Sequence, residues 1–133
     1  MSRFHTLLVA NRGEIACRVF RSARGMGLRT VAVFVEADAE ALFVAEADEA
    51  IRIESYLDGD AIVAAAQATG AGAIHPGYGF LAENAGFATA VSAAGIAWVG
   101  LCAETISSLG AKIEAKRLAV GVGVPVFQLT VEA

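Results

Sequence analysis

The amino-acid sequence predicts an α/β fold in which a parallel β-sheet is covered by helices on both faces. Short, almost wholly apolar runs alternate along the chain with segments of helical period. Continuous apolar strands that are each followed by a helix are typical of parallel sheets buried on both faces. The chain has 133 residues, enough for one ordinary domain, and 56% of them are hydrophobic, which excludes general disorder.

The first half of the chain is expected to form three strands separated by two helices. The first helix ends at a pair of glycines, and its inward stripe is Ile15, Val19, Ser22 or Ala23, and Met26. Asp38 is the expected N-cap of the second helix, which should turn Leu42 and Ala45 inward. In chain order we expect a strand at 7–10, a helix at 13–27, a strand at 30–35, a helix at 38–45 and an edge strand at 49–53.

The second half should continue the alternation of helix and strand. Asp58 or Asp60 caps an alanine-rich helix that runs to Thr69 and stops at Gly70. A domain boundary is expected near residue 110, which divides the chain into 1–110 and 111–133. The remaining elements are a strand at 73–75, a helix at 81–94, a strand at 96–99, and helices at 103–109 and 112–121.

Charge and cysteine content narrow the classes of function. Ten Lys and Arg against fourteen Asp and Glu leave a net charge of −4, which argues against sequence-independent binding of nucleic acid. The longest uncharged stretch, 61–82, is broken by polar residues and glycines, so no membrane span is expected. Cys17 and Cys102 show no CxxC or zinc-ligand spacing, which suits a reducing compartment and a cytoplasmic location.

Ligands of parallel α/β sheets bind beyond the carboxyl ends of the strands, and two motifs fall at that edge. The first is the turn Asn11, Arg12, Gly13 and Glu14, where Asn11 and Glu14 have the spacing of a helix cap. A dinucleotide site would need GxGxxG here, and only one glycine is present. A nicotinamide dehydrogenase domain is therefore disfavoured.

The second motif, residues 74–84, follows a buried strand. Its proline and two glycines predict an irregular loop that allows a ligand to approach the backbone. The residue types leave several roles open. His75 suits a structural histidine, Tyr78 suits either the core or a pocket wall, and Glu83 and Asn84 suit the first turn of the next helix.

Together the two motifs, Asn11-Arg12-Gly13-Glu14-Ile15-Ala16 and His75-Pro76-Gly77-Tyr78-Gly79-Phe80-Leu81-Ala82-Glu83-Asn84, resemble the signature segments of biotin carboxylases. These are the biotin-carboxylating subunits of acetyl-, propionyl- and methylcrotonyl-CoA carboxylases. The resemblance covers essentially the whole chain and implies the Rossmann-like domain that precedes an ATP-grasp fold. It also implies a parent ligase that uses ATP, Mg²⁺ and bicarbonate to carboxylate biotin held on a carrier domain.

The resemblance implies roles for a few residues. Lys112 matches a lysine that contacts ATP, and Tyr78 and Gly79 match a loop that faces the biotin ring. His75, Pro76, Gly77, Glu83 and Asn84 match residues that shape the loop, and no catalytic residue or metal ligand of the family falls within this chain. Arg21 matches a subunit-interface position. By charge alone, Arg18, Arg21 and Arg24 suit either a solvated helix face or a contact for an acidic partner.

Three departures from the family pattern qualify these implications. Leu101 replaces a proline, Ala111 replaces an aspartate beside Lys112, and Gly25 replaces an interface acid, which leaves homodimer formation open. Two hypotheses remain. In the first, the chain is the N-terminal part of a biotin carboxylase and is inactive without its ATP-grasp and C-terminal domains. That parent enzyme would also work with a biotin carrier domain and a carboxyltransferase subunit. In the second, the chain is a short non-catalytic binding module with the same fold.

Overall fold

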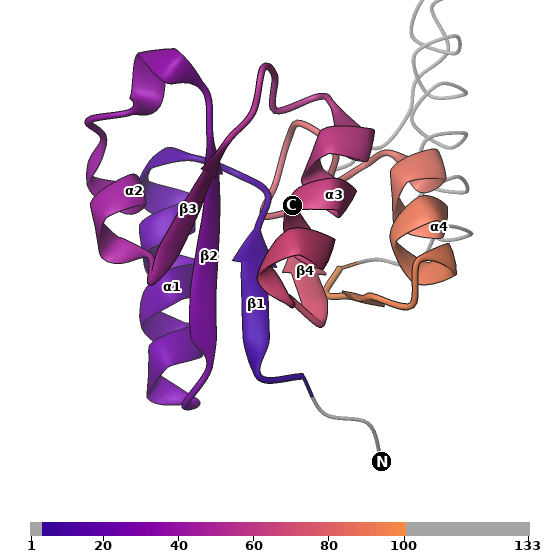
Figure 1. Cartoon of the computed structure of the whole chain (residues 1–133), viewed down its shortest axis with the longest axis horizontal. Helices are drawn as coiled ribbons and strands as arrows, with labels where there is room; N and C mark the ends of the chain where they lie inside the picture. The colour runs from indigo at the N-terminus through magenta and orange to yellow at the C-terminus, as the bar shows by residue number, and fades with distance from the viewer. Residues whose placement is uncertain (1–3, 101–133) are drawn as a thin grey trace, which may run out of the picture.

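The computed structural model describes residues 4–100, which form a five-stranded, fully parallel sheet with helices on both faces (Figure 1). The strand order is β3-β2-β1-β4-β5, so β1 lies at the centre. The elements in chain order are β1 (Thr6–Val9), α1 (Gly13–Gly25), β2 (Arg29–Phe34), the 3₁₀ turn η1 (Glu36–Asp38), α2 (Leu42–Glu46), β3 (Glu49–Arg52), α3 (Gly59–Thr69), β4 (Ala73–His75), α4 (Ala85–Ala93) and β5 (Ala97–Trp98).

The strand order places the helices in two layers. The chain crosses the sheet in one direction from β1 through β2 to β3, and in the opposite direction from β3 to β4 and β5. Right-handed crossovers therefore put α1 and α2 on one face and α3 and α4 on the other (Figure 1). The reversal lies between β1 and β4, where the two strands pair from Leu7–Ala73 to Val9–His75.

The core is the sheet itself together with one large side chain from each helix. Strand residues with no exposed surface alternate between the two faces, as expected for a sheet that is covered on both. Phe87 of α4 packs edge-on against Trp98 of β5, with ring centroids 5.6 Å apart. The fully buried large side chains include Leu8, Val9, Val31, Val33 and Ile74 from strands and Phe20, Phe43, Ile62 and Val91 from helices.

All five predicted strands are confirmed, each to within one or two residues at its ends. The predicted capping of α3 is also confirmed. The Asp58 side chain accepts a hydrogen bond from Ala61 N at 3.1 Å, and the helix ends at Gly70, which has a left-handed φ of 72°. β3 lies at an edge of the sheet, as predicted.

The predicted inward face is partly wrong for the first helix and wrong for the second. In α1 Ala23 is buried as predicted, but the other buried residues are Ala16, Cys17 and Phe20, and Met26 is 73% exposed. In α2 only Phe43 is buried, and Leu42 is 66% exposed. In both helices, the residues that pack against the sheet form a stripe beside the predicted one.

Two predicted helix starts are also wrong. Asp38 does not cap α2, because it ends the short turn η1, and α2 begins four residues later without a side-chain cap. The helix predicted at 81–94 begins only at Ala85. Residues 81–83 form a turn instead, in which Ala82 N donates to Gly79 O at 2.9 Å and Asn84 N donates to Leu81 O at 3.1 Å.

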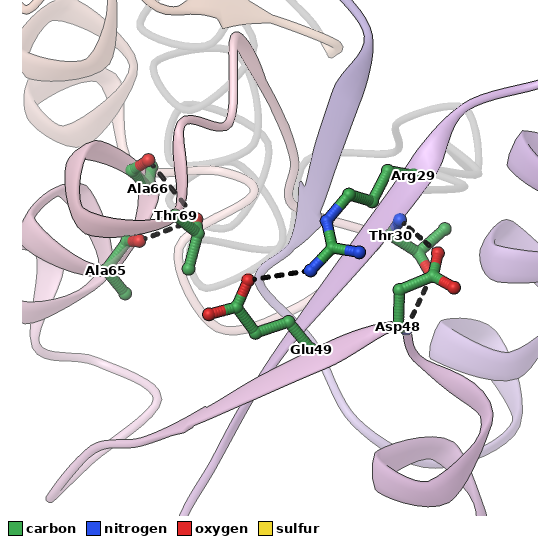
Figure 2. Close-up of polar contacts among 7 residues, drawn as sticks. All are labelled: Arg29, Thr30, Asp48, Glu49, Ala65, Ala66 and Thr69. Atoms are coloured by element: carbon green, nitrogen blue, oxygen red, sulfur yellow. Dashed lines mark hydrogen bonds and ion pairs between the residues drawn. The ribbon is translucent and has the colours of Figure 1, made fainter.

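Polar contacts close the amino-terminal edge of the sheet (Figure 2). The carboxylate of Asp48, just before β3, accepts from Thr30 N at 2.8 Å and from the Thr30 hydroxyl at 3.1 Å. Arg29 and Glu49 form an exposed ion pair at 3.0 Å. At the end of α3 the Thr69 hydroxyl donates to Ala65 O at 2.8 Å. The bonds of Asp48 and Arg29 join the starts of β2 and β3, and the Thr69 bond closes the last turn of α3, on the side away from the two sequence motifs.

Three sequence predictions lie outside the described residues. They are the domain boundary near residue 110 and the helices at 103–109 and 112–121. Among residues 4–100, the longest helix is α1, and no helix has the length and apolar character needed to cross a bilayer.

Candidate functional site at the carboxyl edge of the sheet

The two sequence motifs meet at the carboxyl edge of β1 and β4. Because these strands are parallel neighbours, the turn after Val9 lies beside the loop after His75. The side chain of Asn11, which is only 3% exposed, joins them. Its amide nitrogen donates to Pro76 O at 2.8 Å and to Tyr78 O at 2.7 Å, and its oxygen accepts from Arg12 N at 2.8 Å. The first motif therefore holds the backbone of the second.

Asn11 is not the predicted helix cap. The N-cap position of α1 is Arg12, which makes no side-chain cap hydrogen bond. Glu14 does not reach back to the turn either. It forms an exposed ion pair at 3.3 Å with Arg21, which lies about two helical turns further along α1.

Gly77 is the residue that lets Asn11 approach the loop. Its φ of 64° is left-handed, and a Cβ atom at this position would lie 2.6 Å from the Asn11 amide nitrogen. Such a distance is far inside van der Waals contact, and Asn11 has no freedom to retreat because both of its N–H groups are bonded. Glycine is therefore required here by both backbone conformation and space.

His75 turns its ring back into the loop. Its Nδ1 accepts a hydrogen bond from Gly77 N at 3.0 Å. Burial lowers the pKa of the imidazole, which keeps the ring neutral near pH 7 with its proton on Nε2. The ring thus serves as a hydrogen-bond acceptor for the loop backbone.

A second polar cluster, formed by Arg12, Asp38 and Tyr56, lies beside the loop. Arg12 donates to both carboxylate oxygens of Asp38, from Nε at 2.7 Å and from Nη2 at 2.6 Å. The Tyr56 hydroxyl donates to the same carboxylate at 2.6 Å. Tyr56 and Asp38 are 7% and 8% exposed, so the bond between them is buried, whereas the Arg12 side chain is half exposed. We call these three residues the Arg12–Asp38–Tyr56 cluster.

The cluster shifts the pKa values of its members in opposite directions. The hydrogen bonds from the Arg12 guanidinium lower the pKa of Asp38 to about 2, against the opposing effect of burial. Burial and the bond to Asp38 raise the pKa of Tyr56 to about 12. Asp38 is therefore ionised and Tyr56 protonated throughout the ordinary pH range, which is the pairing that the hydrogen bonds require.

The loop presents aromatic rings at its outer end. Tyr78 is 50% exposed and Phe80 is 42% exposed. The Phe80 ring packs on Tyr56, with centroids 5.1 Å apart and planes tilted by 40°. Phe80 also has a φ of 45°, the only left-handed value among the non-glycine residues that the structure describes. The exposed surface thus combines backbone groups and aromatic rings.

The other predicted site residues take structural or surface positions. Asn84 is the N-cap of α4, and its side chain accepts from Phe87 N at 2.8 Å. Glu83 and Gly79 are exposed, and Lys112 lies outside the described residues. Sequence reasoning missed Asp38 and Tyr56 as members of this edge. The signals that point to them are a buried acid after an apolar strand and a tyrosine in the Ser55-Tyr56-Leu57 turn.

The described residues at this edge do not fit a nucleotide–metal site on their own. Asp38 has both carboxylate oxygens engaged by Arg12 and Tyr56. Within residues 4–100, no three His, Cys, Asp or Glu side chains lie close enough together to hold a metal ion. What this edge exposes, within the described residues, is loop backbone and the aromatic rings of Tyr78 and Phe80.

A groove of about 300 Å³ lies between α1 and the strand residues Leu7 and His75. The stripe of α1 predicted to be buried, from Ile15 and Val19 to Met26, lines it together with Phe4, Leu7 and Val99. This stripe therefore borders the core, with Val19 partly buried against it and Met26 exposed.

A parallel α/β domain that presents a shaped loop at its carboxyl edge, at the reversal of strand order, belongs to the Rossmann-like class of ligand-binding domains. The family model for the N-terminal domain of biotin carboxylase matches residues 3–106, and the chain belongs to that family.

Named relatives agree with the family model. The chain is 51% identical over 129 residues to the methylcrotonoyl-CoA carboxylase subunit alpha, mitochondrial, of Glycine max, covering 92% of this chain and 18% of that protein. It is 50% identical over 122 residues to the propionyl-CoA carboxylase alpha chain of Ruegeria pomeroyi, covering 87% and 18%. The chain thus spans about a fifth of the length of these curated relatives.

Solved structures share the fold. Pyruvate carboxylase from Rhizobium etli matches with a TM-score of 0.83 and 43% identity, covering 96% of this chain and 13% of that one. The biotin carboxylase domain of 2-oxoglutarate carboxylase from Hydrogenobacter thermophilus, described as a dimer with MgADP, ADP and bicarbonate, matches with a TM-score of 0.82 and 44% identity, covering 95% and 29%.

Proposed function

We propose that this chain serves as the N-terminal domain of an ATP-dependent biotin carboxylase within an acyl-CoA carboxylase. The observation that carries the proposal is the bond pair from Asn11 to Pro76 O and Tyr78 O. It joins the two segments that resemble the family signatures, and it fixes the backbone conformation of the loop in the second segment. The family match over residues 3–106 supports the same assignment.

In this proposal the loop Pro76–Phe80 forms one wall of the site where biotin is carboxylated. Tyr78 and Gly79 face the biotin ring, and His75, Pro76, Gly77, Glu83 and Asn84 shape the loop. A half-exposed aromatic ring beside open backbone groups suits a compact, partly apolar ring with polar edges. No general base is assigned to residues 4–100, because the histidine at this edge accepts a backbone hydrogen bond.

The remaining assignments complete the proposal. Residues 1–110 form the Rossmann-like domain, and 111–133 lead into an ATP-grasp domain, with Lys112 contacting ATP. Mg²⁺ and ATP are bound by the other domains of the parent, which works with a biotin carrier domain and a carboxyltransferase subunit. Arg21 lies on the exposed side of α1, where it would be available to a sister subunit. Cytoplasm is the proposed location, although some relatives carry the word mitochondrial in their names.

The experiment that tests the proposal is a domain exchange. Residues 1–133 would replace the matching segment of the Ruegeria pomeroyi propionyl-CoA carboxylase alpha chain, and bicarbonate-dependent ATP cleavage would be measured with free biotin. We expect an active chimera and an inactive isolated chain. A folded but inactive chimera would favour the alternative, a non-catalytic binding module of the same fold, and turnover by the isolated chain would contradict the need for other domains.

Tyr78→Ala in the same chimera tests the biotin-facing role. The loss of an aromatic wall should lower biotin carboxylation about tenfold or more while leaving the melting temperature nearly unchanged, because Tyr78 is half exposed. Gln67→Ala, at an exposed position on α3 outside the loop, is the control and should leave the kinetics unchanged. Unchanged kinetics for Tyr78→Ala would remove this residue from the site.

A further inference from the structure

The loop Pro76–Phe80 is held at two places. The first contact is made by Asn11 of the first motif, and the second is made by Tyr56, which lies outside both motifs. Asn11 fixes its first half through two carbonyl oxygens. Its second half ends at Phe80, whose ring rests on Tyr56. We infer that Tyr56 and Asp38 are positioning residues that set the conformation of the loop through Phe80. The catalytic consequence of this inference rests on the proposed function, whereas its structural part does not.

The backbone at Phe80 indicates that the loop end needs support. A left-handed φ of 45° is unfavourable for a bulky side chain and persists only where the surroundings enforce it. The Tyr56 ring provides the contact, with centroids 5.1 Å apart. Because Phe80 is 42% exposed, core packing does not enclose its ring on all sides.

Tyr56 can support Phe80 because its own ring cannot move. Its hydroxyl donates to Asp38 at 2.6 Å and accepts from Val35 N at 3.4 Å. Asp38 in turn is held by both donors of the Arg12 fork, and a bidentate pair fixes orientation as well as distance. The Arg12–Asp38–Tyr56 cluster therefore places the ring.

Asn11 and Arg12, which are adjacent in the turn after β1, thus fix the two halves of the loop. Asn11 acts on Pro76 and Tyr78 directly, and Arg12 acts on Phe80 through Asp38 and Tyr56. Tyr78 lies between the two supports. Its position should depend on the cluster although it touches none of the three residues in any contact described above.

The competing explanation is that Tyr56 and Asp38 only fill space and add stability. The two explanations differ for Tyr56→Phe, which keeps the ring and its volume but loses the bond to Asp38. A filler role predicts a change spread over the whole domain. A positioning role predicts a change concentrated at Gly77–Phe80.

The first test uses the 133-residue chain. Amide hydrogen exchange at Gly77–Phe80 and chymotrypsin cleavage after Tyr78 and Phe80 would be compared for wild type, Tyr56→Phe, and Glu49→Gln as a control at the opposite edge of the sheet. For Tyr56→Phe we expect loop exchange and cleavage about tenfold faster or more, because the lost hydrogen bond goes to an ionised carboxylate. Exchange in β1 and β2 and all rates in Glu49→Gln should stay near wild type. Unchanged loop rates, or an equal rise in every strand, would overturn the inference.

Asp38→Asn adds a coupling test. If Asp38 acts through Tyr56, the double variant with Tyr56→Phe should open the loop no more than the worse of the two single variants. Additive effects on loop exchange would show that the two residues act separately, which contradicts the inference. Because Tyr56→Phe keeps the Arg12–Asp38 pair, it remains interpretable even if Asp38→Asn does not fold.

The second test uses the active chimera described above. Tyr56→Phe should raise the KM for biotin about five- to tenfold and leave the KM for ATP unchanged, because only the biotin-facing loop is affected. Equal changes in both constants would overturn the positioning role. An inactive wild-type chimera would instead contradict the proposed function, and the exchange experiment on the isolated chain would still decide whether the cluster holds the loop.

Discussion

At the scale of single residues, the site depends on a close approach between Asn11 and Gly77. The buried amide of Asn11 has both N–H groups bonded to loop carbonyls, so it cannot make room for a side chain at position 77. The resemblance pointed to both motifs, but it did not indicate that one side chain joins them. The expected cap role of Asn11 was wrong because helix-cap spacing and a tertiary contact look the same in one sequence.

Gly77→Ala should therefore be costly. The new Cβ would meet the Asn11 nitrogen at 2.6 Å and would also occupy a left-handed conformation, so we expect a loss of about 2–4 kcal/mol in the free energy of unfolding. Urea unfolding checks this value. Gly79→Ala is the matched control, since its φ of 72° is similar but no atom lies within 4 Å of the added Cβ. It should cost only about 1 kcal/mol, and an equal loss in both variants would rule out crowding at Asn11.

The Arg12–Asp38–Tyr56 cluster should make stability fall at both ends of the pH scale. The folded pKa of Asp38, about 2, lies below its ordinary value of 3.8, so its contribution is complete above about pH 4 and is lost as the pH falls toward 2. The folded pKa of Tyr56, about 12, lies above its ordinary value of 10, so its contribution is lost as the pH rises from 10 to 12.

Urea unfolding of the wild type and Asp38→Asn between pH 2 and 7 measures the acid effect. The variant should be less stable at pH 7 by about 2–3 kcal/mol, and the difference should shrink as the pH approaches 2. A shallower acid slope should remain in the variant, because Asp48 also has a lowered pKa owing to its hydrogen bond from the Thr30 backbone. Parallel stability curves for the two proteins would show that Asp38 does not titrate as described.

At the scale of secondary structure, strands were easier to predict than helix faces. A parallel strand buried on both faces must be apolar throughout, so composition alone locates it. A helix such as α1 carries two apolar stripes of the same period, and periodicity cannot choose between them. The sheet packs against the stripe of Ala16, Cys17, Phe20 and Ala23, whereas Ile15, Val19 and Met26 line the groove.

The start of α4 gives a test at this scale. The Asn84 side chain accepts from Phe87 N at 2.8 Å, so Asn84→Ala should destabilise the domain by about 1 kcal/mol through loss of the N-cap. Thermal unfolding checks the value. Glu83→Ala, one residue earlier and exposed, should change stability by less than about 0.5 kcal/mol. If the two variants were equal, the helix would begin where the sequence alone suggested, near residue 81.

At the scale of the whole molecule, the two edges of the sheet have different tasks. The amino edge is closed by local contacts such as Asp48 with Thr30, whereas the carboxyl edge carries the loop and its supports (Figures 1 and 2). The sequence predicted the correct edge for both motifs, since strands that alternate with helices are parallel and end at the same edge. It did not indicate the Asp38–Tyr56 bond, because a single sequence contains no pattern that pairs a carboxylate with one particular hydroxyl 18 residues away.

Asp48→Asn tests this separation of tasks. Replacing the charged acceptor should lower the free energy of unfolding by about 1–2 kcal/mol, because hydrogen bonds to the ionised carboxylate are stronger than those to an amide. Chymotrypsin cleavage after Tyr78 and Phe80 under native conditions should stay within about twofold of wild type. Selective opening of the loop in this variant would mean that the two edges are coupled through the sheet.

The bonds from Asn11 to Pro76 and Tyr78 join residues 65 and 67 positions apart. During synthesis at about 5–20 residues per second, Asn11 must wait several seconds after its own translation before its partners leave the ribosome. β1 must wait equally long to pair with β4. Until then one edge of this apolar strand is unpaired in the nascent chain, and the Asn11 amide is exposed to water. Slowing translation between β3 and β4 should therefore lengthen the time during which this chain needs a chaperone.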